Sequence, residues 1–259
     1  SAISAYGEPE LESNKIETQN LEKQQTINNK NYYLINSLDE IDKWIDEAEE
    51  VGEVAVDTET TSLDPHQADL VGISLCSKIG KACYIPVGHK SPKCLKKEAV
   101  IKKLKKILED PSIKKIGQNI KFDFIVFYKC GITLSSMEDT MLMSYVLDAG
   151  KNRHNMDTLS EIHLGHKTIS FKEMVGTGKK EINFSEVELD KAKDYAAEDA
   201  DVTFRLYKKF IKNLKSEKMI NIYEIFEKPL IKILAFMEIE GVEIDSKFLK
   251  SLSSKFEKK

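Results

Sequence analysis

The chain of 259 residues carries a formal net charge of −4, with 41% hydrophobic and 32% charged residues. This composition is typical of a globular protein with a sizeable core, and it lacks the basic excess that marks a general nucleic-acid binder. The sequence has neither a long apolar run nor a signal segment, and its four cysteines form no Cys-x-x-Cys pair. We therefore expect a cytosolic protein with reduced thiols.

Residues 8–31 contain only four large aliphatic side chains, too few to offset the entropy of ordering the backbone. Residues 1–31 are therefore predicted to be a flexible linker, with order beginning near Tyr32. Ser37 has the residue type and position of an N-cap for a helix over 38–50.

Three strand-like runs follow, over 54–57, 70–76 and 82–87, and Gly80 marks a hairpin turn between the last two. Helical spacing of apolar residues then alternates with one more short strand. The expected elements are a helix over 96–109, a strand over 114–117, helices over 121–129 and 138–148, short helices and loops over 152–184, and long helices over 186–216 and 220–240. This order predicts an α/β fold with a mixed sheet flanked by helices.

Carboxylates gather at the ends of these elements. Asp57 and Glu59 stand two residues apart after a strand, so their side chains point to the same face. Tyr195 and Asp199 are four residues apart on a helix and share a face, from which Asp201 points away.

A fourth carboxylate, Asp123, opens the helix after the strand over 114–117. Each motif alone is ordinary, because Asp-x-Glu suits a turn, Asn-x-x-x-Asp a helix cap, and Tyr-x-x-x-Asp a surface contact. Their combination is harder to produce by chance. Four carboxylates from three segments predict a site for two Mg²⁺ or Mn²⁺ ions, the usual arrangement for phosphodiester hydrolysis.

The segments 57–63, 117–123 and 195–203 resemble the three motifs of the DEDD exonuclease superfamily, tyrosine branch. More narrowly, and together with 153–159 and 166–171, they resemble the 3′→5′ proofreading domain of bacterial DNA polymerase I, a family A polymerase. The resemblance runs from about residue 32 to the end of the chain. It implies an exonuclease domain over 32–217, followed over 218–259 by the start of a polymerase domain.

For the fold, the resemblance implies an RNase H-like architecture with a five-stranded mixed sheet. For the site, it implies that Asp57, Glu59 and Asp199 hold one metal ion and that Asp57 bridges to a second. Asp123 would support the second ion from outside its direct ligands, and Tyr195 would orient the attacking water. All four carboxylates of the family are retained.

The implied substrate is a single-stranded or frayed 3′ end of DNA, cut to 5′-mononucleotides, with Leu63 and Phe171 against the terminal base. The other strand-binding residues implied are Gln118, Asn119, Phe122 and Arg153. Phe122 departs from many relatives, which have tyrosine there, so a hydroxyl contact at this position is in doubt. The implied partner is the polymerase domain of the same full-length chain, in a monomer without membrane contact that is associated with the nucleoid.

Two alternatives remain open. A ribonuclease D-like RNA exonuclease would use the same four carboxylates, and a non-catalytic module would only position DNA for a polymerase. The seven lysines in 93–106 fit a solvated helix face better than a DNA contact. His163 and His166 have no accompanying cysteine pair, which disfavours a zinc site.

Overall fold

The computed structural model describes residues 27–257, apart from the side chain of Lys179. Most of the predicted linker, residues 1–26, lies outside the described residues. Its last part, Asn29–Asn31, forms one 3₁₀ turn, and Asn29 Nδ2 donates to Asp194 Oδ2 at 3.1 Å. The chain is therefore already packed against the body of the protein a few residues before Tyr32.

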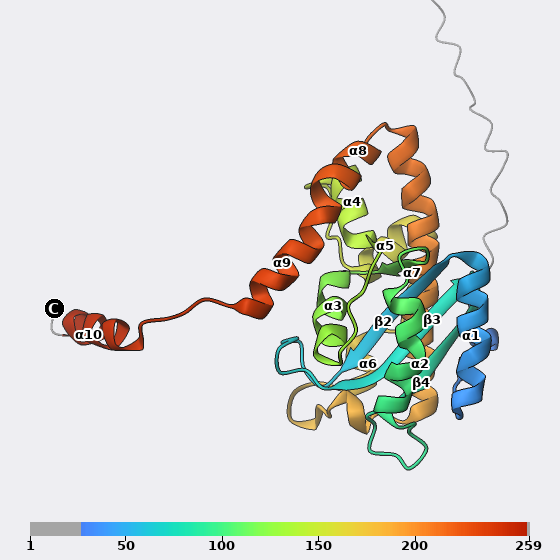
Figure 1. Cartoon of the computed structure of the whole chain (residues 1–259), viewed down its shortest axis with the longest axis horizontal. Helices are drawn as coiled ribbons and strands as arrows, with labels where there is room; N and C mark the ends of the chain where they lie inside the picture. The colour runs from blue at the N-terminus through green and yellow to red at the C-terminus, as the bar shows by residue number, and fades with distance from the viewer. Residues whose placement is uncertain (1–26, 258–259) are drawn as a thin grey trace, which may run out of the picture.

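A single mixed sheet forms the centre of the fold, in the order β1-β4-β3-β2-β5-β6 (Figure 1). Its strands are β1 (Tyr32–Leu34), β2 (Glu53–Thr60), β3 (Leu70–Lys78), β4 (Lys81–Pro86), β5 (Lys114–Gly117) and β6 (Met137–Asp139). The pairs β2–β3 and β3–β4 are antiparallel, and the other three pairs are parallel. The predicted mixed sheet is confirmed, but it has six strands where five were expected. The strand runs expected from the pattern correspond to β2, β3, β4 and β5. The other two strands, β1 and β6, have only three residues each, and β6 lies where the sequence pattern favoured the start of a helix.

Helices cover both faces of this sheet. The helices are α1 (Leu38–Val51), α2 (Lys97–Glu109), α3 (Ile120–Lys129), α4 (Thr140–Asp148), α5 (Met156–Leu164), α6 (Phe171–Val175), α7 (Leu189–Ser216), α8 (Ile220–Ile222), α9 (Lys228–Glu240) and α10 (Ser246–Glu257). In Figure 1, α1, α2 and α3 lie in front of the sheet, and the long α7 crosses behind the sheet. Helices α4 and α5 pack on α7. Across residues 27–257, every helix is too short or too polar to span a membrane.

Local sequence explains how the sheet begins. Ser37 accepts a hydrogen bond from Glu40 N at 3.4 Å, which confirms the predicted N-cap of α1. The β3–β4 hairpin turns through Ile79 and Gly80, and Gly80 has a φ of 79°, which glycine adopts without strain.

The alternation of β2 decides which side chains reach the site. Val54 and Val56 belong to the core beneath α1, α2 and α3, whereas Ala55 belongs to the core beneath α7. Because side chains alternate along a strand, Asp57 and Glu59 continue the face of Ala55 and point toward α7.

Asp201 on α7 ties three elements together and lies off the carboxylate face, as its spacing predicted. It is fully buried and accepts hydrogen bonds from Tyr32 Oη at 2.9 Å, Gly80 N at 2.8 Å and Arg205 Nε at 3.0 Å. Its role is therefore structural: it joins the β1 edge and the hairpin turn to the long helix.

We expect Asp201→Ala to lower the free energy of unfolding by about 3–5 kcal/mol, because a buried arginine would lose its carboxylate partner. Urea unfolding followed by circular dichroism measures this loss. Asp190→Ala, at an exposed position in the first turn of the same helix, is the matched control and should change it little. Equal unfolding midpoints for the two variants would contradict this role.

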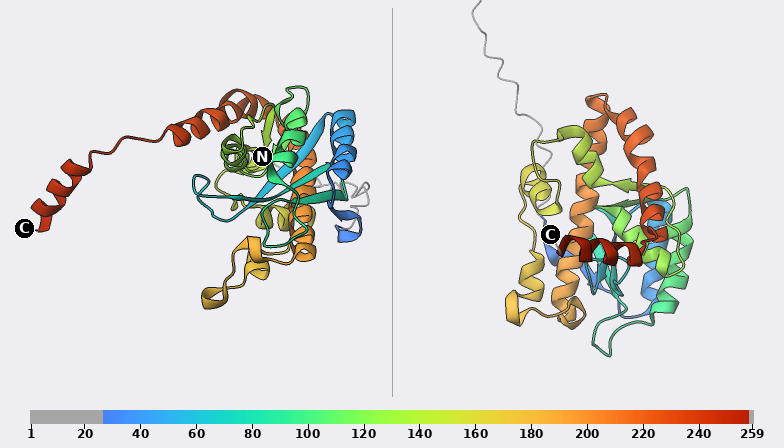
Figure 2. Two further views of the ribbon diagram at one scale, coloured as in Figure 1. Left: turned by 60° about the horizontal axis from the view of Figure 1, so that its bottom comes forward. Right: turned by 90° about the vertical axis from the view of Figure 1, so that its left-hand side faces the viewer.

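The segment after α7 turns back onto the sheet edge. Tyr223, in a π-helical turn over Tyr223–Glu227, is fully buried, and its hydroxyl accepts from Asp139 N and donates to Glu138 Oε2, each at 2.9 Å. Lys228 Nζ pairs with the same Glu138 at 2.6 Å. Helix α9 then packs along α3, whereas α10 stands away from the body in Figure 1 and in the left view of Figure 2.

Candidate active site

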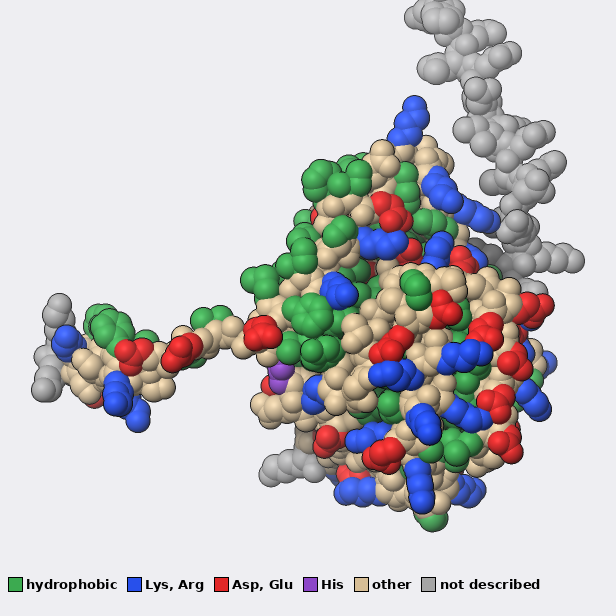
Figure 3. Space-filling model, in the orientation of Figure 1, with side chains coloured by type: hydrophobic (Ala, Val, Ile, Leu, Met, Phe, Trp, Pro, Cys, Tyr) green, Lys and Arg blue, Asp and Glu red, His purple; other side chains and the backbone are tan. Residues whose placement is uncertain are grey.

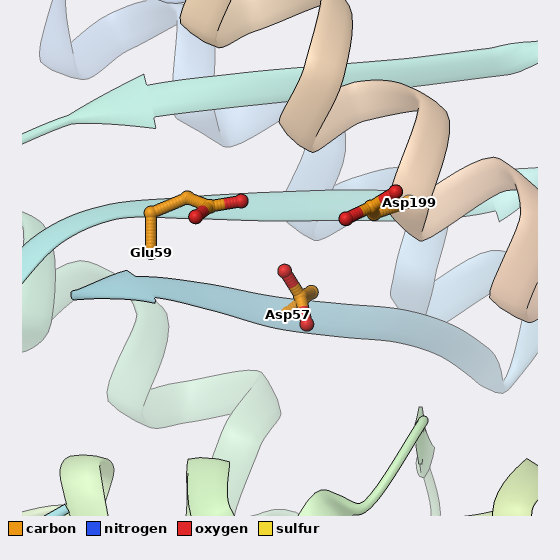
Figure 4. Close-up of side chains that lie close together, drawn as sticks. All are labelled: Asp57, Glu59 and Asp199. Carbon is orange, nitrogen blue, oxygen red and sulfur yellow. The ribbon is translucent and has the colours of Figure 1, made fainter. Parts of the chain in front are cut away.

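Three carboxylates meet between β2 and α7. One carboxylate oxygen from each of Asp57, Glu59 and Asp199 lies within 4.8 Å of the other two. Figure 4 shows the three side chains turned toward a common space, two from the strand and one from the helix. Glu59 and Asp199 are buried and Asp57 is partly exposed, so the cluster is largely shielded from solvent and reaches it at Asp57.

Asp123 reaches the same region from the opposite side of β2. Its Oδ1 accepts from Thr58 N at 3.0 Å and from Thr58 Oγ1 at 2.6 Å. This is possible because β5 pairs with β2 only as far as Ala55, which leaves the strand edge at Thr58 open to α3. Asp123 therefore lies beside the three-carboxylate cluster and is anchored to the strand that carries two of its members.

Burial and mutual repulsion disfavour the ionised form of these acids. Burial raises the pKa of Asp57 to about 6, and it raises the pKa of Glu59 well above its usual value, as does the charge of Asp57. Burial and the charge of Asp57 likewise raise the pKa of Asp123 and of Asp199. A cation among them would remove this repulsion.

The donor set fits a divalent ion. Oxygen ligands suit hard cations such as Mg²⁺ and Mn²⁺. In addition, among residues 27–257 no donor lies within hydrogen-bonding distance of Asp199 Oδ1, although this oxygen is buried. A buried carboxylate oxygen without a partner is costly, and a metal ion would satisfy it.

Tyr195 stands one helical turn before Asp199 and belongs to an aromatic wall. Its ring centroid lies 5.8 Å from that of Phe184 and 6.3 Å from that of Phe171. Burial and the charge of Asp199 raise the pKa of the Tyr195 hydroxyl well above its usual value, so the hydroxyl stays protonated. It can therefore donate a hydrogen bond but is unsuited to act as a base.

The proposed strand-binding residues differ in exposure. Leu63 is 89% exposed and Phe171 is 42% exposed, so both are available to a nucleobase. Arg153 is exposed, and Phe122 is partly buried against the core of the α3 face.

Gln118 and Asn119 are held by their neighbours. Gln118 Nε2 donates to His154 O at 2.7 Å, and its Oε1 accepts from Thr140 Oγ1 at 2.5 Å. Asn119 has a φ of 60°, in the left-handed region, and its backbone N–H donates to Asp139 Oδ1 at 3.1 Å. Both residues are therefore fixed at the start of α3.

The sequence interpretation missed several residues that build this site. Asp139 accepts from four backbone N–H groups at the starts of α3 and α4, namely those of Asn119, Ile120, Met141 and Leu142. Glu198 accepts from Ile169 N at 2.6 Å and contacts His166 Nε2 at 2.8 Å. It thereby fixes the segment that leads to Phe171. An Asp directly before an apolar helical run was the available signal for a capping Asp139.

The lysine run divides into two groups. Lys103 and Lys106 pair with Asp42 and Glu49 of α1, which agrees with a solvated helix face. Lys96 and Lys97 instead line a cleft of ≈ 490 Å³ whose wall includes Thr61, close to the end of β2.

A family model described as a 3′-5′ exonuclease, of family A DNA polymerases, matches residues 32–215. The chain belongs to this family. A DNA polymerase I of Rhizobium leguminosarum is 42% identical over 243 residues, which are 86% of this chain and 24% of that protein. The chain thus spans about a quarter of the length of such relatives.

Solved structures confirm the RNase H-like fold of this exonuclease domain. The POL domain of Pol1 from M. smegmatis, in complex with DNA primer-template and dNTP, superposes with a TM-score of 0.68 at 19% identity, covering 87% of this chain and 35% of that one. Escherichia coli RNase D, an exoribonuclease, superposes with a TM-score of 0.63 at 19% identity, covering 79% of this chain and 50% of that one. At these identities the likeness concerns the fold alone.

Proposed function

We propose that this exonuclease domain removes nucleotides from single-stranded or frayed 3′ ends of DNA by two-metal hydrolysis, as the proofreading part of a bacterial DNA polymerase. The observation that carries the proposal is the meeting of Asp57, Glu59 and Asp199 within 4.8 Å, with a protonated tyrosine one helical turn from Asp199. Family membership supports the direction of cleavage, and DNA polymerase I relatives support DNA as the substrate.

Each residue has a distinct role in this proposal. Asp57, Glu59 and Asp199 would hold Mg²⁺ or Mn²⁺, and Asp123 would hold β2 in place through Thr58 and add negative charge to the second ion's site. Bound divalent ions lower the pKa of water and stabilise charge on the departing 3′ oxygen. The Tyr195 hydroxyl would orient the attacking water by donating or accepting a hydrogen bond.

A frayed end would be held at the rim. Leu63 and Phe171 would lie against the terminal base, while Gln118, Asn119 and Arg153 would follow the strand. Phe122 would contribute ring packing but no hydroxyl contact to the strand. Stacking of about 1–3 kcal/mol per base holds a freed strand without reading its sequence, so a mismatched end is selected because it frays more readily.

The segment over 218–259 is proposed to open the polymerase domain, with the exonuclease domain over 32–217. Helices α9 and α10 carry exposed apolar side chains, which appear in green along the arm in Figure 3. Examples are Ile233 at 52% and Met237 at 63% on α9, and Phe248 at 62% on α10. Apolar groups so exposed usually meet a partner surface, and the length of the relatives supports a polymerase domain as that partner. Such a protein would work in the cytoplasm, near the nucleoid.

The test is digestion of 5′-labelled single-stranded DNA beside an RNA of the same sequence, with Mg²⁺, with Mn²⁺ and with EDTA. We expect a ladder shortening from the 3′ end of DNA that EDTA abolishes. A ladder on RNA alone would favour the ribonuclease D-like alternative, because such an enzyme would read the 2′-hydroxyl. DNA binding without cleavage of either substrate would favour the non-catalytic module.

We expect Tyr195→Phe to lower kcat by about 10- to 100-fold, because loss of the hydroxyl leaves the water poorly oriented. The metal sites should stay intact, so the metal-induced rise in Tm should match that of the wild type. Single-turnover cleavage of single-stranded DNA and thermal unfolding with Mn²⁺ measure the two quantities. An unchanged kcat would remove Tyr195 from the mechanism.

A further inference from the structure

Behind the carboxylates, Tyr84 on β4 lies across a glycine. A Cβ at Gly72 would lie 2.1 Å from the Tyr84 hydroxyl, so only glycine leaves room for this ring. Gly72 is the β3 partner of Glu59 in the sheet. The fully buried Tyr84 therefore fills the space beside a proposed metal ligand.

His89 continues this packing away from the sheet. Its Nε2 lies 2.7 Å from the Tyr84 hydroxyl, and its side chain is only 7% exposed. The two rings meet edge to face, with centroids 5.7 Å apart at 87°. Burial lowers the pKa of His89, so the ring is neutral at physiological pH and one ring nitrogen forms the hydrogen bond to Tyr84.

The His89 ring also supports the wall that holds Tyr195. Its centroid lies 5.8 Å from that of Phe184, which in turn lies 5.8 Å from that of Tyr195. On the same Phe184, the ring of Phe171 stacks at 6.2 Å with an interplanar angle of 9°. A chain of four rings therefore runs from the sheet beside Glu59 to Tyr195, in the order Tyr84, His89, Phe184 and Tyr195.

Building on the proposed function, we propose that His89 is a positioning residue for Tyr195: clamped by the Tyr84 hydroxyl, it fixes Phe184 and thereby the tyrosine that orients the attacking water. His89 itself touches neither DNA nor the carboxylates in this role. Its loss therefore acts on kcat through Tyr195, and the number of bound metal ions stays the same. A histidine that only fills the core would affect stability without any special link to Tyr195.

The test is a double-mutant cycle between His89→Ala and Tyr195→Phe, with kcat measured at saturating single-stranded DNA. We expect His89→Ala to lower kcat about tenfold in the wild type, and less than about twofold when Tyr195 is already Phe. His89→Phe keeps a ring against Phe184 but loses the hydrogen bond with Tyr84. It should therefore restore only part of the lost rate. Equal losses in both backgrounds would overturn the proposal.

A control comes from His163, a partly buried histidine that also packs against an aromatic ring. The ring of His163 on α5 meets Phe210 of α7 at 4.8 Å and 90°. Phe210 lies about 22 Å along the helix from Tyr195, given a rise of 1.5 Å per residue. His163→Ala should lower Tm by an amount comparable to that for His89→Ala while leaving kcat unchanged. A similar fall in kcat for both variants would mean that general destabilisation explains the effect.

A spectroscopic measurement separates this proposal from the proposed function. In protein labelled with 3-fluorotyrosine, the ¹⁹F signal of Tyr195 is assigned by its disappearance in Tyr195→Phe. His89→Ala should shift or broaden this signal, and His163→Ala should leave it unchanged. An unmoved signal would overturn the positioning role whatever the activity. A moved signal in a protein that cleaves no nucleic acid would support the positioning role and refute the exonuclease function.

Discussion

Asp57→Ala is expected to lower the rate of DNA cleavage by about 10³-fold or more, the largest loss among single substitutions in the site. Asp57 is the centre of the acidic cluster, because its charge raises the pKa of Glu59, Asp123 and Asp199 alike. In the proposed two-metal arrangement, a carboxylate close to all three would be shared by both ions, so its removal would weaken both sites.

Rapid-quench cleavage of single-stranded DNA with Mn²⁺ measures the rate, and calorimetric titration with Mn²⁺ counts the sites. Asp57→Asn tests the same position with little change of volume and should lose nearly as much activity. Asp190→Ala, whose carboxylate is exposed on α7, should cleave like the wild type. Retention of more than a tenth of the wild-type rate by Asp57→Ala would refute the assigned site.

The second large effect concerns the stability of the metal-free protein. The pKa of the Asp57 carboxyl rises from an ordinary value of 3.8 to about 6 on folding, and that of Asp199 is raised in the same direction. A raised acid pKa means that the folded state binds more protons than the unfolded state. The stabilising contribution of these acids is therefore present below about pH 4 and is lost as the pH rises through about 6 and beyond.

At pH 7.5 a saturating divalent ion should restore that stability. At 100 times its dissociation constant a ligand adds about 2.7 kcal/mol, which corresponds to a rise in Tm of about 5–10 °C for a protein of this size. In EDTA, Asp199→Asn should have a higher Tm than the wild type, and Mn²⁺ should raise that Tm much less. Thermal unfolding of both proteins between pH 4 and 8 tests the sign. If, in EDTA, the Tm of the wild type exceeded that of Asp199→Asn by a margin that grew with pH, the predicted sign would be wrong.

Much of the site followed from spacing alone. Period-two alternation placed Asp57 and Glu59 on one face, and period 3.6 placed Tyr195 and Asp199 on another, and the structure brings Asp57, Glu59 and Asp199 together. These residues were predictable because strand and helix geometry fix side-chain directions locally. The same spacing correctly predicted that Asp201 points away from these residues.

Other features depend on contacts between distant segments. The hydrogen bond that Thr58 N donates to Asp123 forms because the pairing of β5 with β2 stops at Ala55. Where a strand stops depends on the whole sheet and cannot be predicted from a local pattern. The strand β6 was read as helix because three residues carry too little pattern to show alternation. The position of Tyr84 over Gly72 could not be predicted from the sequence, since the space above Gly72 appears only once β3 and β4 pair.

The buried Tyr223 hydroxyl, shared between Asp139 and Glu138, has a consequence for building chimeric polymerases. The family match ends at residue 215, yet Tyr223 and Ile231 are buried in the cores of the sheet domain. A graft cut at the end of α7 would leave Glu138 without its tyrosine and lysine partners and would uncover α3. A transplantable exonuclease module should therefore include the chain through the end of α9, so that the junction falls in the segment before α10.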